Sequence, residues 1–102
     1  MKFKVWFTKD DKPVLGRGGV ELLMAIDEAG SLHAAAKKLG YSYSFAWTYI
    51  RRLEKSLGTK LVKFSRGGYR GGSAKLTDEG RELINLYLRV ESEIEKTLKN
   101  LL

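Results

Sequence analysis

The chain has 102 residues, with 19 Lys and Arg against 12 Asp and Glu and a formal charge of +7, and this length predicts one domain with one modest core. A hydrophobic share of 43%, with 11% aromatics and one proline, excludes disorder for most of the chain. The lack of cysteine excludes disulfides, thiolate metal sites and cysteine nucleophiles. No apolar run reaches the length of about 18 residues that spans a bilayer. With no signal peptide at the N-terminus, we expect a cytoplasmic protein without a membrane partner.

The excess positive charge is confined to the middle of the chain. Residues 1–30 and 77–102 carry net charges of 0 and −2, whereas residues 31–76 carry ten basic residues and one acidic residue, a net charge of +9. Such a block attracts a polyanion, because Lys and Arg neutralise phosphates and release their condensed counterions. The alternatives to nucleic-acid binding are that the block is simply a solvated basic face, or that it binds anionic lipid. We expect nucleic acid as the partner.

The first third of the chain predicts a strand, a turn and a helix. Phe3, Val5 and Phe7 alternate with polar residues, which is typical of a half-buried edge strand, and residues 10–13 are predicted to form a turn. After the glycines at 16–19, apolar residues recur on one helical face until a helix end at a glycine. This face comprises Leu22, Leu23, Ile26 and Ala29, and the terminal glycine is Gly30.

Two short helices follow. Ser31 is a good N-cap for a helix that ends at Gly40, and a third helix is predicted from about Ser42 to Gly58. Ala36 on the inner face of the second helix has no bulk to hold the two helices apart. Two consecutive helices joined at a glycine are typical of a helix-turn-helix.

The third helix supplies the predicted DNA-reading surface, because a major groove about 12 Å wide admits an α-helix. Arg51 is long enough to reach guanine O6 and N7, and Ser42 and Tyr43 lie where a helix N-terminus favours phosphate oxygens. We place Trp47 in the seam between this helix and the next hairpin, with a groove-facing role as the alternative. The predicted DNA contacts here are Lys37, Ser42, Tyr43, Ser44, Trp47, Thr48, Arg51, Arg52 and Lys55.

A basic hairpin with a glycine-rich tip is predicted after the third helix. Leu61, Val62 and Phe64 interleave with basic residues, and a glycine-rich stretch leads to residues 74–76. Glycines at the tip permit close approach to the sugar–phosphate surface. The predicted contacts of the hairpin are Arg66, Tyr69, Arg70 and Lys75. The order of helices and hairpin predicts a mainly α fold with a small β-hairpin, a winged helix-turn-helix.

The sequence resembles the N-terminal DNA-binding domain of ModE-type molybdate-responsive regulators over about residues 1–90. The matching segments are residues 4–6, 12–16, 25–32, 35–37, 42–47, 67–68, 71–72, 74–77, 80 and 83–87. A more distant similarity to LysR-type regulators lies in residues 50–58 and 76–80. Both resemblances imply a DNA-binding winged helix-turn-helix and a dimer. Because the sequence stops at Leu102, we expect no effector-binding domain and do not extend molybdate binding to this chain.

Residues 77–102 predict one long helix capped by Thr77, with Asp78 and Glu79 in its first turn. At 1.5 Å per residue such a helix is about 40 Å long, so part of it must protrude from a small domain. Its apolar residues recur at nearly heptad spacing, which favours pairing with a second copy. The alternative is that residues 83–87 pack on the domain's own core and the remainder frays. The predicted dimer contacts are Leu83, Tyr87, Val90, Ile94, Leu98 and Leu101.

No catalytic or metal-ligating set is predicted. His33 is the only histidine, and residues 31–53 contain no carboxylate that would complete a metal site with it. The glycine-rich stretch 67–73 lacks the lysine of a phosphate-binding loop. We therefore expect no cofactor and no enzyme.

We expect one domain in which residues 1–76 form the winged helix-turn-helix and residues 77–102 form the dimerisation helix. The predicted function is sequence-selective binding of double-stranded DNA by a homodimer that regulates transcription. An architectural DNA-binding protein of low sequence specificity and a protein-interaction module are the alternatives.

Overall fold

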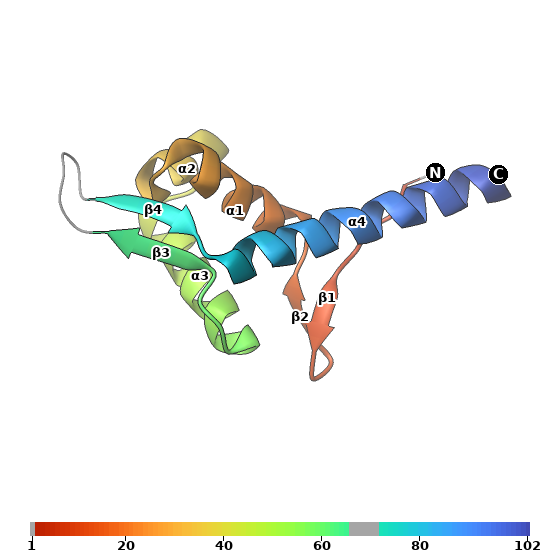
Figure 1. The fold of residues 1–102 in the computed structure, drawn as a ribbon, viewed down its shortest axis with the longest axis horizontal. Helices are drawn as coiled ribbons and strands as arrows, with labels where there is room; N and C mark the ends of the chain where they lie inside the picture. Colours follow the sequence, from red (N-terminus) through yellow and green to blue (C-terminus); the bar gives the residue numbers. More distant parts are fainter. Residues whose placement is uncertain (1, 66–71) are drawn as a thin grey trace.

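The computed structural model describes residues 2–65 and 72–102 (Figure 1). In chain order the elements are β1 (Phe7–Lys9), β2 (Lys12–Leu15), α1 (Arg17–Ala29), α2 (Leu32–Leu39), α3 (Tyr43–Leu57), β3 (Val62–Ser65), β4 (Ser73–Leu76) and α4 (Asp78–Leu101). The strands form two separate antiparallel hairpins, β1–β2 and β3–β4. The predicted winged helix-turn-helix with a long C-terminal helix is confirmed.

The helix boundaries follow the predicted caps. The side chains of Ser31, Ser42 and Thr77 each accept a hydrogen bond from the backbone N–H three residues later, at 3.0 to 3.1 Å. Gly40 has a φ of 80°, in the left-handed region that favours glycine, and it ends α2. Helices α1 and α3 also end at glycines in the left-handed region, Gly30 and Gly58. Local sequence rules therefore determine where these helices begin and end.

The N-terminal segment differs from the predicted single strand. Strand β1 begins only at Phe7, and the chain from residue 10 onward turns back to form β2, which the sequence analysis did not predict. Asp10 and Asp11 form the turn with φ values of 51° and 63°, a conformation that aspartate tolerates better than most residues. Pro13 lies in β2 rather than in the turn. Helix α1 also begins earlier than predicted, at Arg17.

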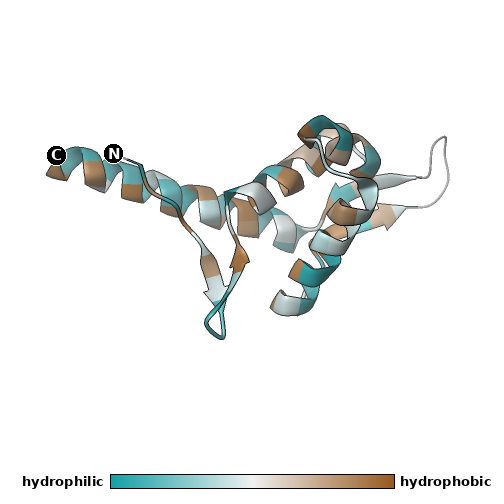
Figure 2. Ribbon diagram, turned by 180° about the vertical axis from the view of Figure 1, so that it is seen from behind, coloured by the Kyte–Doolittle hydropathy of each residue, from teal (hydrophilic) through white to brown (hydrophobic). Residues whose placement is uncertain are grey.

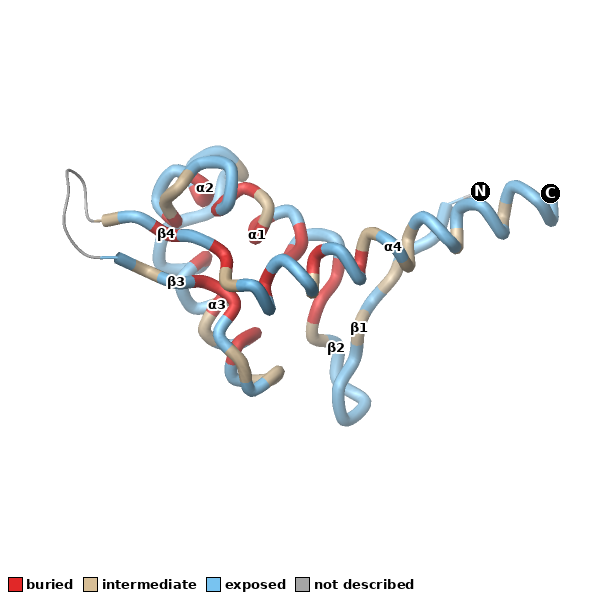
Figure 3. The backbone as a smooth tube through the Cα atoms, viewed as in Figure 1, coloured by how far each residue is buried: buried red, intermediate tan, exposed pale blue. Residues whose placement is uncertain are grey.

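The hydrophobic core lies between the three helices α1, α2 and α3, the hairpin β3–β4 and the first half of α4 (Figure 3). Helix α1 runs through its centre, and Val20, Leu23 and Ile26 have no exposed surface. Gly19 allows close packing, because a Cβ atom there would overlap the Tyr49 hydroxyl and the Leu15 side chain. The remaining buried apolar residues are Leu15, Leu22, Ala25, Leu32, Ala35, Ala36, Ala46, Ile50, Leu53, Leu61, Val62, Ala74, Leu76, Ile84 and Tyr87.

The hairpin β3–β4 is anchored at its base to the rest of the domain. Val62 pairs with Leu76, and Ser65 pairs with Ser73 at the other end of the ladder. The Ala74 N–H donates to the Gly30 carbonyl at 2.8 Å, which joins β4 to the turn between α1 and α2. The predicted glycine-rich tip, with Arg66, Tyr69 and Arg70, lies outside the described residues.

Helix α4 begins against the core and then protrudes from it, as its predicted length required (Figure 1). The molecule is accordingly elongated, with extents of 52 × 28 × 24 Å. Tyr87 is fully buried, and its hydroxyl donates to the Val5 carbonyl at 2.8 Å, so the N-terminal segment lies against α4. Burial raises the pKa of Tyr87 above the ordinary value of 10.0; the Glu91 carboxylate raises it further, and Arg17 opposes the shift.

Candidate nucleic-acid interface

Helices α2 and α3 cross closely at a seam of small residues. Ala36 is 1% exposed and Ala46 is 0% exposed, so the helices approach without bulky side chains between them. The Tyr41 N–H donates to the Ala36 carbonyl at 2.9 Å directly after Gly40, which fixes the turn. This close crossing leaves the opposite side of α3, the second helix of the helix-turn-helix, uncovered by the rest of the described chain.

The first two turns of α3 present an exposed surface of hydroxyl and aromatic side chains. Ser44 and Thr48 are exposed and lie one turn apart, opposite the buried Ala46 and Ile50. Phe45 is 54% exposed on one flank of this strip. Tyr43 and Trp47 flank it on the other side, with stacked rings whose centroids are 6.4 Å apart. This part of α3 therefore presents its side chains to solvent.

Trp47 lies in the seam between α3 and β3, where the sequence analysis placed it. Its ring centroid is 5.0 Å from that of Phe64, and the Arg51 guanidinium lies 4.3 Å above the Trp47 ring. The same guanidinium lies 5.1 Å from the Phe64 ring. Trp47 remains 36% exposed, so one edge of it still faces solvent. These contacts join α3 to strand β3 of the hairpin β3–β4.

Glu54 holds the base of the hairpin β3–β4, which is the wing of the winged helix-turn-helix. The sequence analysis did not identify this residue. Its carboxylate is 5% exposed and accepts hydrogen bonds from the backbone N–H groups of Leu61 at 2.8 Å and Val62 at 3.2 Å. Arg51 Nη1 donates to the same carboxylate at 2.8 Å, and Lys60 Nζ lies 4.0 Å from it. Arg51 therefore has a partner within the chain, and a contact with guanine would compete with that ion pair.

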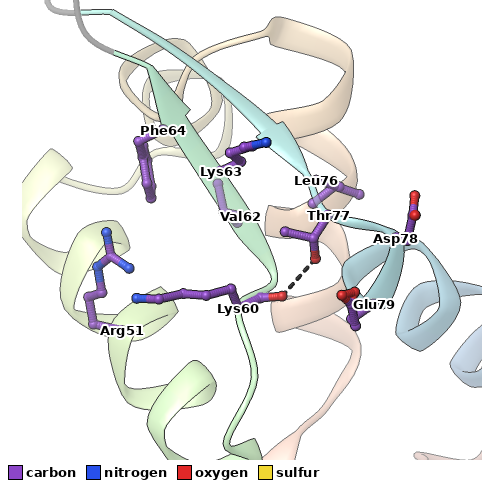
Figure 4. Close-up of a pocket in the computed structure, with 9 residues that line it drawn as sticks. All are labelled: Arg51, Lys60, Val62, Lys63, Phe64, Leu76, Thr77, Asp78 and Glu79. Carbon is purple, nitrogen blue, oxygen red and sulfur yellow. Dashed lines mark hydrogen bonds between the residues drawn. The ribbon is translucent and has the colours of Figure 1, made fainter.

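Arg51 and Lys60 also line a hollow of about 630 Å³ between α3, β3 and the start of α4. Figure 4 shows the Lys60 side chain extending toward Arg51 on one side of the hollow, with Asp78 and Glu79 on the other side. Basic and acidic groups line the same hollow, so it has no uniform charge that would favour an anion.

The burial of Glu54 shapes the charge of the whole middle segment. Glu54 is the only acidic residue among residues 31–76, so this basic segment presents almost no carboxylate to solvent. Lys38 is paired with Glu28 of α1 at 3.2 Å. The other exposed bases of α2, α3, β3 and β4 are Lys37, Arg52, Lys55, Lys63 and Lys75. All except Lys63 were among the predicted DNA contacts.

The predicted dimer contacts divide into two groups along α4. Tyr87 has no exposed surface, because its ring packs 5.2 Å from Phe7 inside the domain, so it does not face a second copy and that prediction is corrected. Leu83 is partly buried against the same core. Beyond it, Val90, Ile94, Leu98 and Leu101 extend along the protruding half, where apolar bands recur to the C-terminal end (Figure 2).

Other kinds of site find no support in the described part of the chain. His33 is exposed in the first turn of α2, with its ring 6.3 Å from that of Tyr43. Among the described residues, no group of three His, Cys, Asp or Glu residues is arranged to hold a metal ion. None of the helices in residues 2–65 and 72–102 is long and apolar enough to cross a membrane.

A helix-turn-helix followed by a β-hairpin and a long helix is the architecture of a winged helix-turn-helix DNA-binding domain. The chain belongs to the lysR family of bacterial regulatory helix-turn-helix proteins, whose family model matches residues 19–81. This is a family of transcription regulators rather than of enzymes.

Individual relatives agree with this assignment and with the resemblance to ModE-type regulators. The molybdenum-pterin-binding protein MopB of Rhodobacter capsulatus is 37% identical over 84% of this chain and 32% of its own length. The DNA-binding transcriptional dual regulator ModE of Escherichia coli is 40% identical over 67% of this chain and 26% of its own length. The chain thus spans about a third or less of these relatives.

A solved structure has the same arrangement. The DNA-binding domain of CbnR, crystallised as a complex with DNA, is 26% identical, with a TM-score of 0.58 over 79% of this chain and 87% of that chain. The fold of the present chain is therefore one that occurs bound to DNA in a related protein.

Proposed function

We propose that this chain is a DNA-binding transcription regulator, and that two copies paired through α4 bind a pseudo-palindromic site in double-stranded DNA sequence-selectively. The observation that carries the proposal is the uncovered N-terminal half of α3 within a basic segment whose only carboxylate is buried. Duplex DNA fits this surface, because it is a polyanion whose major groove is wide enough to admit α3. The family and the DNA complex of CbnR support the same partner.

The proposed roles follow from where each group lies. Exposed lysines and arginines around α3 and the wing would contact phosphates, which position the protein without selecting a sequence. Side chains of the first turns of α3 would contact base edges in the major groove. The base of the wing is fixed by Glu54, and the exposed Lys75 of β4 would contact the flanking DNA backbone.

The protruding apolar stripe of α4 supports pairing through this helix. Ile94 and Leu98 lie one turn apart, and neither belongs to the hydrophobic core or to the partly buried residues packed against it. A second α4 presents the same spacing and buries both stripes. Two-fold symmetry would then place two recognition helices about 34 to 36 Å apart, or a multiple of that distance.

The test is a selection from a randomised duplex pool, followed by fluorescence-anisotropy titration of recovered duplexes across a salt series. Recovery of a motif repeated on opposite strands, with log K falling steeply against log salt, is the expected result. Steep salt dependence without an enriched motif would replace the proposal with an architectural role. Absence of binding at physiological salt would contradict it and favour a protein-docking role for α4.

A further inference from the structure

The start of the recognition helix lacks every side chain that selects a base by paired hydrogen bonds. Guanine is typically selected by Arg or Lys, adenine by Asn or Gln, and cytosine by Asp or Glu. Residues 41–50 are Tyr, Ser, Tyr, Ser, Phe, Ala, Trp, Thr, Tyr and Ile, and none belongs to these types. Sequence selection by this part of α3, which the proposed function requires, must therefore use another kind of contact.

The first long polar side chains further along α3 are directed elsewhere. Arg51 donates to Glu54 at 2.8 Å and stacks on Trp47, so it is held between the helix and the wing. Arg52 lines a hollow together with Pro13 and Val14, on the side of α3 that faces the hairpin β1–β2. Neither guanidinium extends along the exposed surface of the first two helical turns.

Besides single hydroxyl groups, that surface offers apolar contact area. Phe45 is 54% exposed, although its ring has aromatic neighbours on both sides: Tyr41 at 5.2 Å and Tyr49 at 6.4 Å between ring centroids. These neighbours hold the ring at the surface without covering it. Thr48 lies on the exposed strip next to Phe45 and carries a methyl group. A large apolar side chain held at the surface is typical of a binding site.

We propose, building on the DNA-binding function proposed above, that Phe45 and Thr48 select thymines in each half-site through apolar contact with the thymine C5-methyl group. In the major groove this methyl group distinguishes a T·A pair from the other pairs, and Phe and Thr side chains are suited to contact it. The exposed lysines around α3 would hold the duplex by its phosphates. The surface is thus fitted to duplex DNA whose half-sites contain thymine at one or two defined positions.

The experiment replaces thymine by uracil in the duplex recovered by selection, one position at a time. This change removes the C5-methyl group and leaves every hydrogen-bonding group in place. Wild-type protein should lose affinity about fourfold for each contacted methyl group. Phe45→Ala and Thr48→Ser should each abolish the loss at one position, because the variant no longer contacts that methyl group. Phe45→Leu, which keeps an apolar side chain, should retain most of the loss.

The results separate this proposal from the function on which it rests. A motif that is enriched but insensitive to uracil at every thymine would overturn the methyl contact and leave sequence-selective binding intact. Uracil sensitivity that persists unchanged in both variants would also overturn it, because the methyl group would then act on the shape of the DNA. A wild-type protein that enriches no motif overturns both proposals at the selection step. Circular dichroism of each variant checks that it is folded.

Discussion

Removing the Glu54 carboxylate should destabilise the domain far more than removing any surface carboxylate. In Glu54→Ala the N–H groups of Leu61 and Val62 lose their acceptor, and these residues are only 1% and 2% exposed, so water does not replace it. A buried donor left without a partner costs about 1 to 3 kcal/mol. Arg51, at 34% side-chain exposure, regains water and adds little.

The loss of the acceptor for two buried N–H groups sets the expected change in the free energy of unfolding at about 2 to 6 kcal/mol. Domains of this kind are stable by about 5 to 15 kcal/mol, so Glu54→Ala should approach the limit of folding. Glu54→Gln keeps a carbonyl oxygen for the two N–H groups and should recover about half of the loss. The matched control is Glu28→Ala, because Glu28 is paired with Lys38 but 62% exposed.

Urea unfolding followed by circular dichroism measures these differences, at one protein concentration because the proposed pairing of two copies would shift apparent stability. Glu28→Ala should change the free energy of unfolding by less than about 1 kcal/mol. A loss of less than about 1 kcal/mol in Glu54→Ala would show that Leu61 and Val62 do not depend on this acceptor. Equal losses in Glu54→Ala and Glu54→Gln would show that charge, rather than acceptor geometry, is the stabilising feature.

Three further outcomes are expected. Ile94→Asp should shift the protein from dimer to monomer in sedimentation with little change in circular dichroism, and an unchanged mass would contradict pairing through α4. Lys37→Ala should reduce the slope of log K against log salt by about 0.9, whereas Lys99→Ala at the far end of α4 should not, and equal slopes would remove Lys37 from the interface. The raised pKa of Tyr87 means that its stabilising contribution is complete below pH 10.0 and is lost as the pH rises above that value toward the folded-state pKa. Tyr87→Phe should therefore cost about 1 kcal/mol at pH 7 and flatten the alkaline fall in urea titrations, and an equally steep fall in both proteins would assign it to other groups.

Sequence reasoning succeeded where local chemistry decides the structure. Ser31 and Gly40 delimit α2 because a side-chain acceptor and a left-handed residue act within a few residues of the chain. It failed in the N-terminal hairpin, where Pro13 was assigned to the turn. The turn instead uses Asp10 and Asp11 at positive φ, which alternation of apolar residues does not reveal.

The sequence predicted that the candidate site lies on α3 and the following hairpin. It did not predict the contacts that Glu54 and Tyr87 make inside the domain. Glu54 follows Ile50 by four residues and so lies on the buried face of α3, a spacing that signals burial if charged residues are not assumed to be exposed. Its partners Leu61 and Val62 lie beyond the end of the helix, and no local pattern connects them to it. Tyr87 shares the apolar stripe of α4, and only the tertiary fold shows that Phe7 and Val5 cover it.

The junction between the wing and α4 is a single residue. Strand β4 ends at Leu76, α4 begins at Asp78, and Thr77 between them is held by its N–H to the Leu61 carbonyl at 2.9 Å and by its hydroxyl to the Lys60 carbonyl at 2.7 Å. In a dimer paired through α4, this rigid joint would fix the distance between the two half-sites that the dimer binds. Each base pair added between half-sites turns one of them by about 34° around the duplex and moves it further away, so the protein would tolerate only one spacer length.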